Sequence, residues 1–144
     1  MAIDLSEQAL DSRKGGPFGA VITREGKIIG SSGNQVLKLT DPTAHAEIMA
    51  IRDACGNMGS TDLSGCEIFS SAEPCPMCAA AIYWAGLKHI YFCNTEKEAL
   101  DYGFMDKEIL EEQQKPSSKR KIKSSRIINP SALKVFDKAL KQNG

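Results

Sequence analysis

The pattern of hydrophobic and polar positions predicts strands that alternate with helices over the first two-thirds of the chain. Two β-prone runs, residues 18–24 and 27–31, are separated by Glu25-Gly26, a spacing typical of a tight antiparallel hairpin. Helices are expected over residues 41–55 and 74–84, and short interior strands over residues 66–70 and 89–93. This alternation favours a sheet whose central strands are parallel and covered by helices.

The remaining segments complete a three-layer α/β/α architecture. A helix over residues 4–14 should end at Gly15-Gly16-Pro17, because glycine stops a helix and proline cannot extend it. Residues 126–128 are expected to form a last edge strand, which makes a mixed five-stranded sheet with an antiparallel first hairpin. The other expected segments are one or two short helices over 96–114, a surface loop over about 115–125 and an amphipathic helix over about 131–141. The 144 residues are the size of one domain, so we expect a single domain over residues 1–144.

Composition and charge exclude several classes of protein. Hydrophobic residues make up 42% and charged residues 25% of the chain, as in globular proteins. Eighteen basic residues balance eighteen acidic ones, so the chain lacks the positive field of a dedicated nucleic-acid binder, although a local patch stays possible. The longest apolar run, residues 78–87, is too short to cross a membrane. We therefore expect neither a membrane nor a nucleic acid as a partner.

The cysteines point to a metal or to catalytic thiols. The chain has five, an odd number that fits a disulfide framework poorly. Its first residues carry an acid where a secretory signal needs basic residues, so a cytoplasmic location is expected. Cys66 and Cys93 fall in expected strands and are interpreted as small buried hydrophobes, and Cys55 as a core residue.

Two fragments, Thr43-Ala44-His45-Ala46-Glu47 and Glu73-Pro74-Cys75-Pro76-Met77-Cys78, carry the candidate chemistry. Cys75 and Cys78 are three residues apart at a helix start, where both thiolates face the same way and can bind one metal ion. His45 can add an imidazole from the neighbouring helix. Three ligands leave one tetrahedral position open, which distinguishes a catalytic zinc from a structural one. The pattern thus predicts Zn²⁺ held by His45, Cys75 and Cys78.

Glu47 is the candidate proton carrier. Zinc lowers the pKa of bound water to about 7, so a hydroxide nucleophile exists at neutral pH. Glu47 lies two residues beyond His45, close enough to take a proton from this water and pass it to a substrate nitrogen and then to a leaving amine. A His-x-Glu followed by Pro-Cys-x-x-Cys is the signature of zinc-dependent nucleobase deaminases.

The chain resembles the bacterial guanine deaminases, which belong to the cytidine/deoxycytidylate deaminase-like zinc family. Gly15-Gly16-Pro17-Phe18-Gly19-Ala20, the two fragments above, Ala81-Ile82-Tyr83-Trp84-Ala85 and Gly103-Phe104-Met105-Asp106 carry the resemblance. It implies the cytidine deaminase-like fold, a zinc ion in each subunit, a homodimer, and hydrolysis of guanine to xanthine and ammonia. The hydroxide would attack the amino-bearing ring carbon with Glu47 as proton shuttle. Phe18, Asn34, Trp84 and Asp106 would shape the pocket for this small purine base.

The chemistry of these side chains suits guanine. The carboxylate of Asp106 only accepts hydrogen bonds, which matches the adjacent N1–H and N2–H donors of guanine. Phe18 and Trp84 can sandwich the ring, and Asn34 can both donate and accept. The structural alternatives are that the two aromatic residues pack in the core, that Asp106 is a surface acid and that Asn34 is a turn residue.

Three alternative functions are left open by the sequence. A guanosine deaminase would share the motifs and need only a wider pocket mouth. A tRNA adenosine-to-inosine deaminase also carries Asp-Pro-Thr-Ala-His-Ala-Glu, but should show a basic face and salt-sensitive RNA binding. A non-catalytic zinc-binding module requires a fourth protein ligand, and no residue lies at a suitable spacing.

Overall fold

The computed structural model describes residues 1–144, which divide into two compact units, Met1–Leu110 and Glu111–Gly144. The first unit contains a four-stranded sheet in the order β2-β1-β3-β4. Its strands are β1 (Gly19–Arg24), β2 (Lys27–Gly33), β3 (Glu67–Ala72) and β4 (His89–Asn94). β1 pairs antiparallel with β2 and β3, and β3 pairs parallel with β4. The expected mixed sheet and antiparallel first hairpin are confirmed, and the single domain over residues 1–144 stays a prediction.

The prediction of a fifth strand is wrong. Residues 126–128 lie in an irregular segment with exposed side chains. Ile127 and Ile128 have the β-branched side chains that favour strands, but strand propensity forms no sheet without a neighbouring strand to supply the ladder hydrogen bonds.

The hairpin turn follows from its two central residues. Glu25 and Gly26 have φ values of 50° and 77°, so both adopt the left-handed conformation of the tight turns that match strand twist. Glycine carries no penalty there, and a single glutamate is tolerated. The turn pairs Arg24 of β1 with Lys27 of β2, and a register shift between Ile22 and Thr23 then pairs Ile22 with Gly30.

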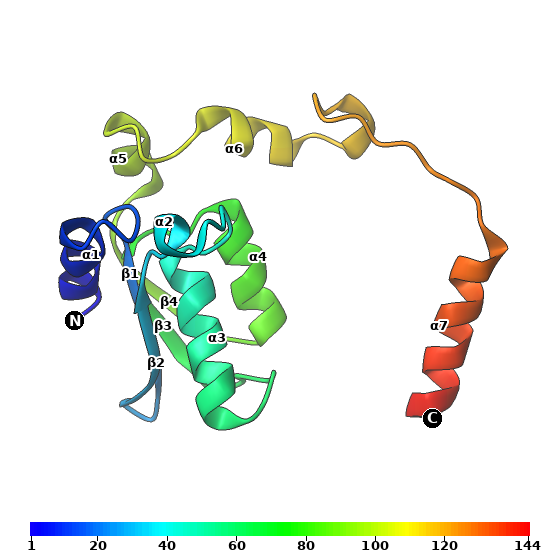
Figure 1. Ribbon diagram of the computed structural model, residues 1–144, viewed down its shortest axis with the longest axis horizontal. Coiled ribbons are helices and arrows are strands. Elements are labelled where there is room, and N and C mark those ends of the chain that lie inside the picture. Colours follow the sequence, from blue (N-terminus) through cyan, green and yellow to red (C-terminus); the bar gives the residue numbers. More distant parts are fainter. The chain divides into compact units, whose positions relative to one another are not determined.

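Helices cover the two faces of the sheet. α1 (Ala2–Asp11) lies on one face, and α3 (Ala46–Met58) and α4 (Pro76–Ala85) lie on the other (Figure 1). Two glycines of β2 allow this close approach. A Cβ at Gly30 would lie 2.5 Å from the backbone nitrogen of Ala54 in α3, and one at Gly33 would lie 2.8 Å from the carbonyl oxygen of Leu5 in α1. The three-layer α/β/α arrangement is thus present in this unit.

The core lies between the sheet and α3. Ala46, Ala50 and Ala54 recur every four residues on one side of α3 and are fully buried. They contact a layer formed by the paired residues Ile22 and Ile68 of neighbouring strands. Small side chains on the helix bring its axis close to the sheet, and the start of α3 is linked to β3 by the hydrogen bond between Glu47 and Ser70.

The structure agrees with the predictions for Cys55 and Cys66 but not with that for Cys93. Cys66 is fully buried, as expected, and Cys55 packs against the core. Cys93 is exposed near the end of edge strand β4, so its prediction as a buried residue is wrong.

The helix boundaries differ from the predicted ones near the prolines. α3 begins at Ala46 because the Asp41 side chain accepts hydrogen bonds from the Thr43 amide (2.8 Å) and hydroxyl (2.6 Å), which forms a turn instead of a first helical turn. A short helix that the sequence did not suggest, α2 (Val36–Leu39), precedes this turn.

The last part of the chain is helical with irregular connections. It contains α5 (Glu96–Asp101), α6 (Lys107–Gln114), the 3-10 turn η1 (Ser117–Lys119) and α7 (Pro130–Asn143). The predicted C-terminal helix is confirmed, and the predicted loop over about 115–125 contains only η1. None of the helices combines the length and apolar character that a membrane span requires.

Candidate active site

The two metal-binding fragments lie at the starts of adjacent helices. His45 is the N-cap of α3, and Cys75 is the N-cap of α4, both with extended backbone conformations. Cys78 lies in the first turn of α4, which has proline at its start. The unpaired amides and positive dipole end of a helix start favour thiolate over thiol. The fold therefore brings His45 next to two cysteines that lie 30 and 33 residues further along the chain.

The distances in this cluster fit a zinc ion. The Nδ1 atom of His45 lies 3.6 Å from the Sγ atom of Cys75 and 3.5 Å from that of Cys78. All three ligand atoms lie within 4.8 Å of one another. Zn–S bonds of about 2.3 Å and a Zn–N bond of about 2.0–2.1 Å at tetrahedral angles place nitrogen and sulfur about 3.6 Å apart. The side chains thus have the spacing that one tetrahedral ion needs.

The cysteine pKa values show why a cation is favoured here. A hydrogen bond from the Cys78 thiol lowers the pKa of Cys75 to about 4, while this bond and burial raise the pKa of Cys78. The hydrogen bond with Cys75 also raises the pKa of His45. One proton is thus held between the two sulfur atoms, and a metal ion replaces it when both cysteines bind as thiolates.

Glu47 lies beside the cluster in the first turn of α3. Only 6% of its surface is exposed, and burial raises the pKa of its carboxyl group. Its Oε1 atom accepts a hydrogen bond of 3.1 Å from the hydroxyl of Ser70 in β3. A buried carboxyl group next to a metal site is suited to take up and release a proton near neutral pH.

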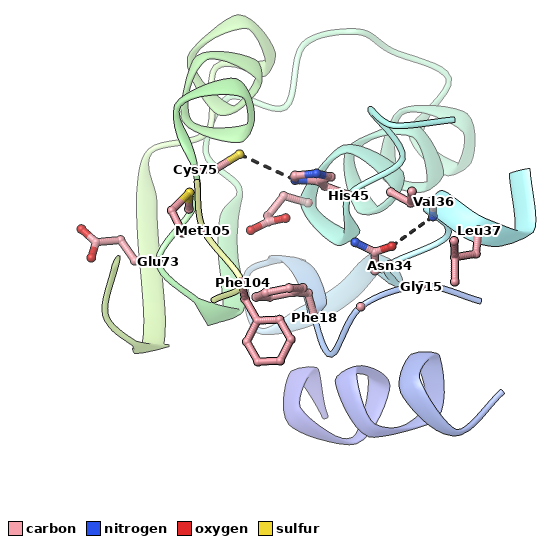
Figure 2. Close-up of a pocket in the computed structure, with 12 residues that line it drawn as sticks. Gly15, Phe18, Asn34, Val36, Leu37, His45, Glu73, Cys75, Phe104 and Met105 are labelled. Atoms are coloured by element: carbon pink, nitrogen blue, oxygen red, sulfur yellow. Dashed lines mark hydrogen bonds between the residues drawn. The ribbon is translucent and has the colours of Figure 1, made fainter. Parts of the chain in front are cut away.

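A cavity of about 350 Å³ opens onto His45, Glu47 and Cys75. This volume lies in the range of about 300–1,000 Å³ that is usual for small-molecule sites. Phe18 and Phe104 form one wall, with ring centroids 6.0 Å apart and planes at 88° (Figure 2). The lining combines apolar surface with a few polar groups, as in sites that bind flat heterocycles.

Asn34 presents its amide to this cavity in a fixed orientation. Its Oδ1 atom accepts a hydrogen bond of 3.0 Å from the Val36 amide, which is visible in Figure 2. Its side chain therefore turns the NH₂ group, a donor, toward the remaining space. Gly15 lies against the same amide, and a Cβ there would be 1.9 Å from Oδ1.

The other two expected base-binding residues lie outside the cavity. Trp84 is on α4 with 90% of its surface exposed. Asp106 is exposed just before α6, and its Oδ1 atom accepts a hydrogen bond of 2.8 Å from the Glu108 amide. Their roles stay predictions.

Several lining residues were not assigned from the sequence. These are Gly15, Gly16, Val36, Leu37, Glu73, Phe104 and Met105. Five of them stood in sequence fragments quoted above, close to assigned residues, so position within a motif was the available signal. Val36 and Leu37 lie on α2, a helix that no sequence pattern predicted.

Glu73 lines the cavity, but its carboxylate forms a hydrogen bond with the start of α5. Its carboxylate points away from the centre of the close-up (Figure 2). It accepts a hydrogen bond of 2.7 Å from the Glu96 amide. This contact ties the segment before Cys75 to the start of α5, and α5 leads to Phe104 on the cavity wall.

Comparisons with known proteins agree with this site. The family model of the cytidine and deoxycytidylate deaminase zinc-binding region matches residues 1–94. Guanine deaminase of Bacillus subtilis is 44% identical over 121 residues, which are 84% of this chain and 78% of that protein. The X-ray structure of guanine deaminase from Bacillus subtilis superimposes with a TM-score of 0.92 and 39% identity, covering 97% of this chain and 89% of that one.

A second group of relatives shares less of the chain. The tRNA-specific adenosine deaminase of Aquifex aeolicus is 42% identical over 82 residues, which are 57% of this chain and 54% of that protein. The family match, the His-Cys-Cys cluster and the glutamate beside it all indicate a zinc-dependent deaminase. The chain belongs to the cytidine and deoxycytidylate deaminase family of zinc-dependent hydrolytic enzymes.

Proposed function

We propose that this enzyme hydrolyses guanine to xanthine and ammonia. The observation that carries the proposal is the cavity of about 350 Å³ that ends on the His45–Cys75–Cys78 cluster and on Glu47. The similarity to a guanine deaminase, which extends over 84% of the chain, supports a purine base as substrate. In this arrangement C2 of guanine, which carries the amino group, faces the cluster.

The protons of the reaction can be assigned to Glu47. When bound, the zinc ion supplies a nucleophile by lowering the pKa of water. Glu47 takes the first water proton and gives it to N3, next to the carbon that gains oxygen. It then carries the second water proton to the 2-amino group, so that the C–N bond breaks and ammonia leaves. Both water protons are thereby accounted for, one on N3 of xanthine and one on ammonia.

The cavity wall suits the flat base. Phe18 offers an apolar surface to the ring, and Asn34 offers a donor that matches N7 or the O6 carbonyl of guanine. We propose that Asp106 accepts from the N–H edge of the base and that Trp84 contributes to a pocket in the assembled enzyme. Both residues would have to act from outside the cavity of the single chain.

The alternatives have weaker support. A guanosine deaminase would need room for ribose beyond the Phe18–Phe104 wall. A tRNA adenosine deaminase is favoured by one observation, the 42% identity to such an enzyme, but that match covers 57% of this chain and the net charge is zero. A non-catalytic zinc module would need a fourth protein ligand, whereas the cluster has three.

A substrate panel tests the proposal. Zinc-loaded protein is incubated with guanine, guanosine, adenine, cytosine and a tRNA anticodon stem-loop, and ammonia release is measured. We expect release from guanine only. If guanosine or the RNA is deaminated and guanine is not, the substrate assignment is wrong. The deamination chemistry would then still stand. No release from any of them would contradict the proposed activity.

We also propose that the enzyme is a cytoplasmic homodimer of purine metabolism. Tyr83 and Trp84 lie next to each other on α4 with 84% and 90% of their surfaces exposed, and such aromatic pairs favour protein interfaces. A reducing compartment keeps Cys75 and Cys78 available as thiolates. Sedimentation equilibrium should give twice the chain mass of 15.6 kDa, and a monomer would contradict the dimer.

A further inference from the structure

Ser70 contacts the proton carrier from strand β3. Its hydroxyl donates to Oε1 of Glu47 at 3.1 Å, across 23 residues of sequence. Both side chains are buried, with 4% of Ser70 and 6% of Glu47 exposed. A buried hydrogen bond to a carboxylate is among the stronger ones, because water cannot replace the donor.

The two partners differ in rigidity. Ser70 lies on β3 and is paired with Ala20 of β1 and with Phe92 of β4, so its backbone is held on both sides. Glu47 carries a long side chain with three rotatable bonds, and each of its staggered rotamers would place the carboxyl group elsewhere. The fixed hydroxyl therefore selects one rotamer of the flexible acid.

We propose that Ser70 is a positioning residue that holds the Glu47 carboxyl group at the reacting atoms. The proposal rests on the proposed function. Positioning affects the transition state more than substrate binding, because proton transfer requires alignment that binding of the purine does not. Loss of the hydroxyl should therefore lower kcat and leave KM nearly unchanged.

The neighbouring serine supplies a matched control. Ser71 is also buried on β3, but its hydroxyl oxygen accepts a hydrogen bond of 3.0 Å from the Gly19 amide, away from the site. Ser71→Ala removes the same atom from the same strand without touching Glu47. A merely structural effect of losing a buried serine hydroxyl would appear in both variants.

The experiment compares Ser70→Ala, Ser70→Thr and Ser71→Ala in the full-length, zinc-loaded protein. We expect Ser70→Ala to lower kcat about 10- to 100-fold, as for loss of a hydrogen bond to a charged group, with KM for guanine within about threefold. Ser70→Thr keeps the hydroxyl and should restore most of kcat. Ser71→Ala should keep kcat within about threefold of that of the unsubstituted protein, at the level expected for substitutions outside the site.

Two further readouts do not depend on turnover. Calorimetric titration with xanthine, the proposed product, should give the same dissociation constant for Ser70→Ala and the unsubstituted protein. A crystal structure of Ser70→Ala should show the Glu47 carboxyl group in another or in several rotamers. If the unsubstituted protein leaves guanine unchanged, the proposed function fails, and the crystal structure still tests the positioning role.

Each of four results would overturn the positioning role. They are a kcat of Ser70→Ala within threefold of the unsubstituted value, an equal loss in Ser71→Ala, no recovery in a folded Ser70→Thr, and an unchanged Glu47 rotamer in crystals of Ser70→Ala.

Discussion

Replacing Gly15 by alanine places a methyl group in the space that Asn34 occupies. The added Cβ would lie 1.9 Å from Oδ1 of Asn34, 2.7 Å from its Cγ and 2.9 Å from its carbonyl oxygen. Rotation of the side chain relieves only the first two contacts. The backbone of Asn34 is itself held by a hydrogen bond of 2.9 Å from its amide to the Phe18 carbonyl. Both the side chain and the backbone of Asn34 must therefore move.

The magnitude follows from the contacts that are lost. Displacing Oδ1 breaks the 3.0 Å hydrogen bond from the Val36 amide, which costs about 0.5–1.5 kcal/mol. Overpacking a filled site adds strain of about 1–3 kcal/mol. The free energy of unfolding of Gly15→Ala should therefore fall by about 1.5–4.5 kcal/mol. Because the Asn34 donor no longer faces the base, KM for guanine should rise about 10-fold or more, with kcat and zinc content little changed.

The assay combines urea unfolding with steady-state ammonia release, and Gly56→Ala is the control. Gly56 lies in α3, is exposed, and has no atom within 4 Å of an added Cβ. Alanine there should stabilise the protein by about 0.5–1 kcal/mol through helix propensity and leave KM unchanged. A folded Gly15→Ala enzyme with normal KM, or one whose crystal structure shows Asn34 in place, would refute the reasoning.

Three other predictions concern the cluster, the proton carrier and the core. Dialysis against a strong chelator should abolish ammonia release and zinc should restore it, measured beside metal content; activity that survives complete metal removal would contradict the assignment. Glu47→Gln should retain zinc and lower kcat at least about 100-fold, and near-normal kcat would exclude Glu47 as the proton carrier. Ile22→Ala should lower the free energy of unfolding by about 2–5 kcal/mol, since the Ile22 side chain of β1 is fully buried in the core with Ile68 and the alanines of α3; a loss below 1 kcal/mol in urea unfolding would show that the core relaxes around it.

The metal cluster could be predicted because its determinants are local in sequence. The spacing of Cys75 and Cys78 places both sulfur atoms at one helix start, and His45 begins the neighbouring helix. The fold supplies only the approach of two helix starts, which the alternation of strands and helices already implied. The hairpin was predictable for the same reason, since Glu25 and Gly26 determine its turn.

The surroundings of the cluster depend on contacts that no local pattern encodes. Ser70 meets Glu47 only because β3 lies beside the start of α3, and Gly15 meets Asn34 only after the chain has turned through the hairpin. Asp41 shows the opposite case, in which a local hydrogen bond to Thr43 replaces the first helical turn that Pro42 suggested. The strand expected at residues 126–128 needed a neighbour that propensity alone does not provide.

The most direct measurement follows the oxygen atom that enters the product. Zinc-loaded protein is incubated with guanine in ¹⁸O-enriched water, and the purine product and ammonia are quantified by mass spectrometry and a coupled assay. Hydrolysis at C2 predicts equal amounts of ammonia and xanthine, with the label in xanthine at the enrichment of the water. Guanine recovered unchanged, or xanthine without the label, would contradict hydrolytic deamination by this enzyme.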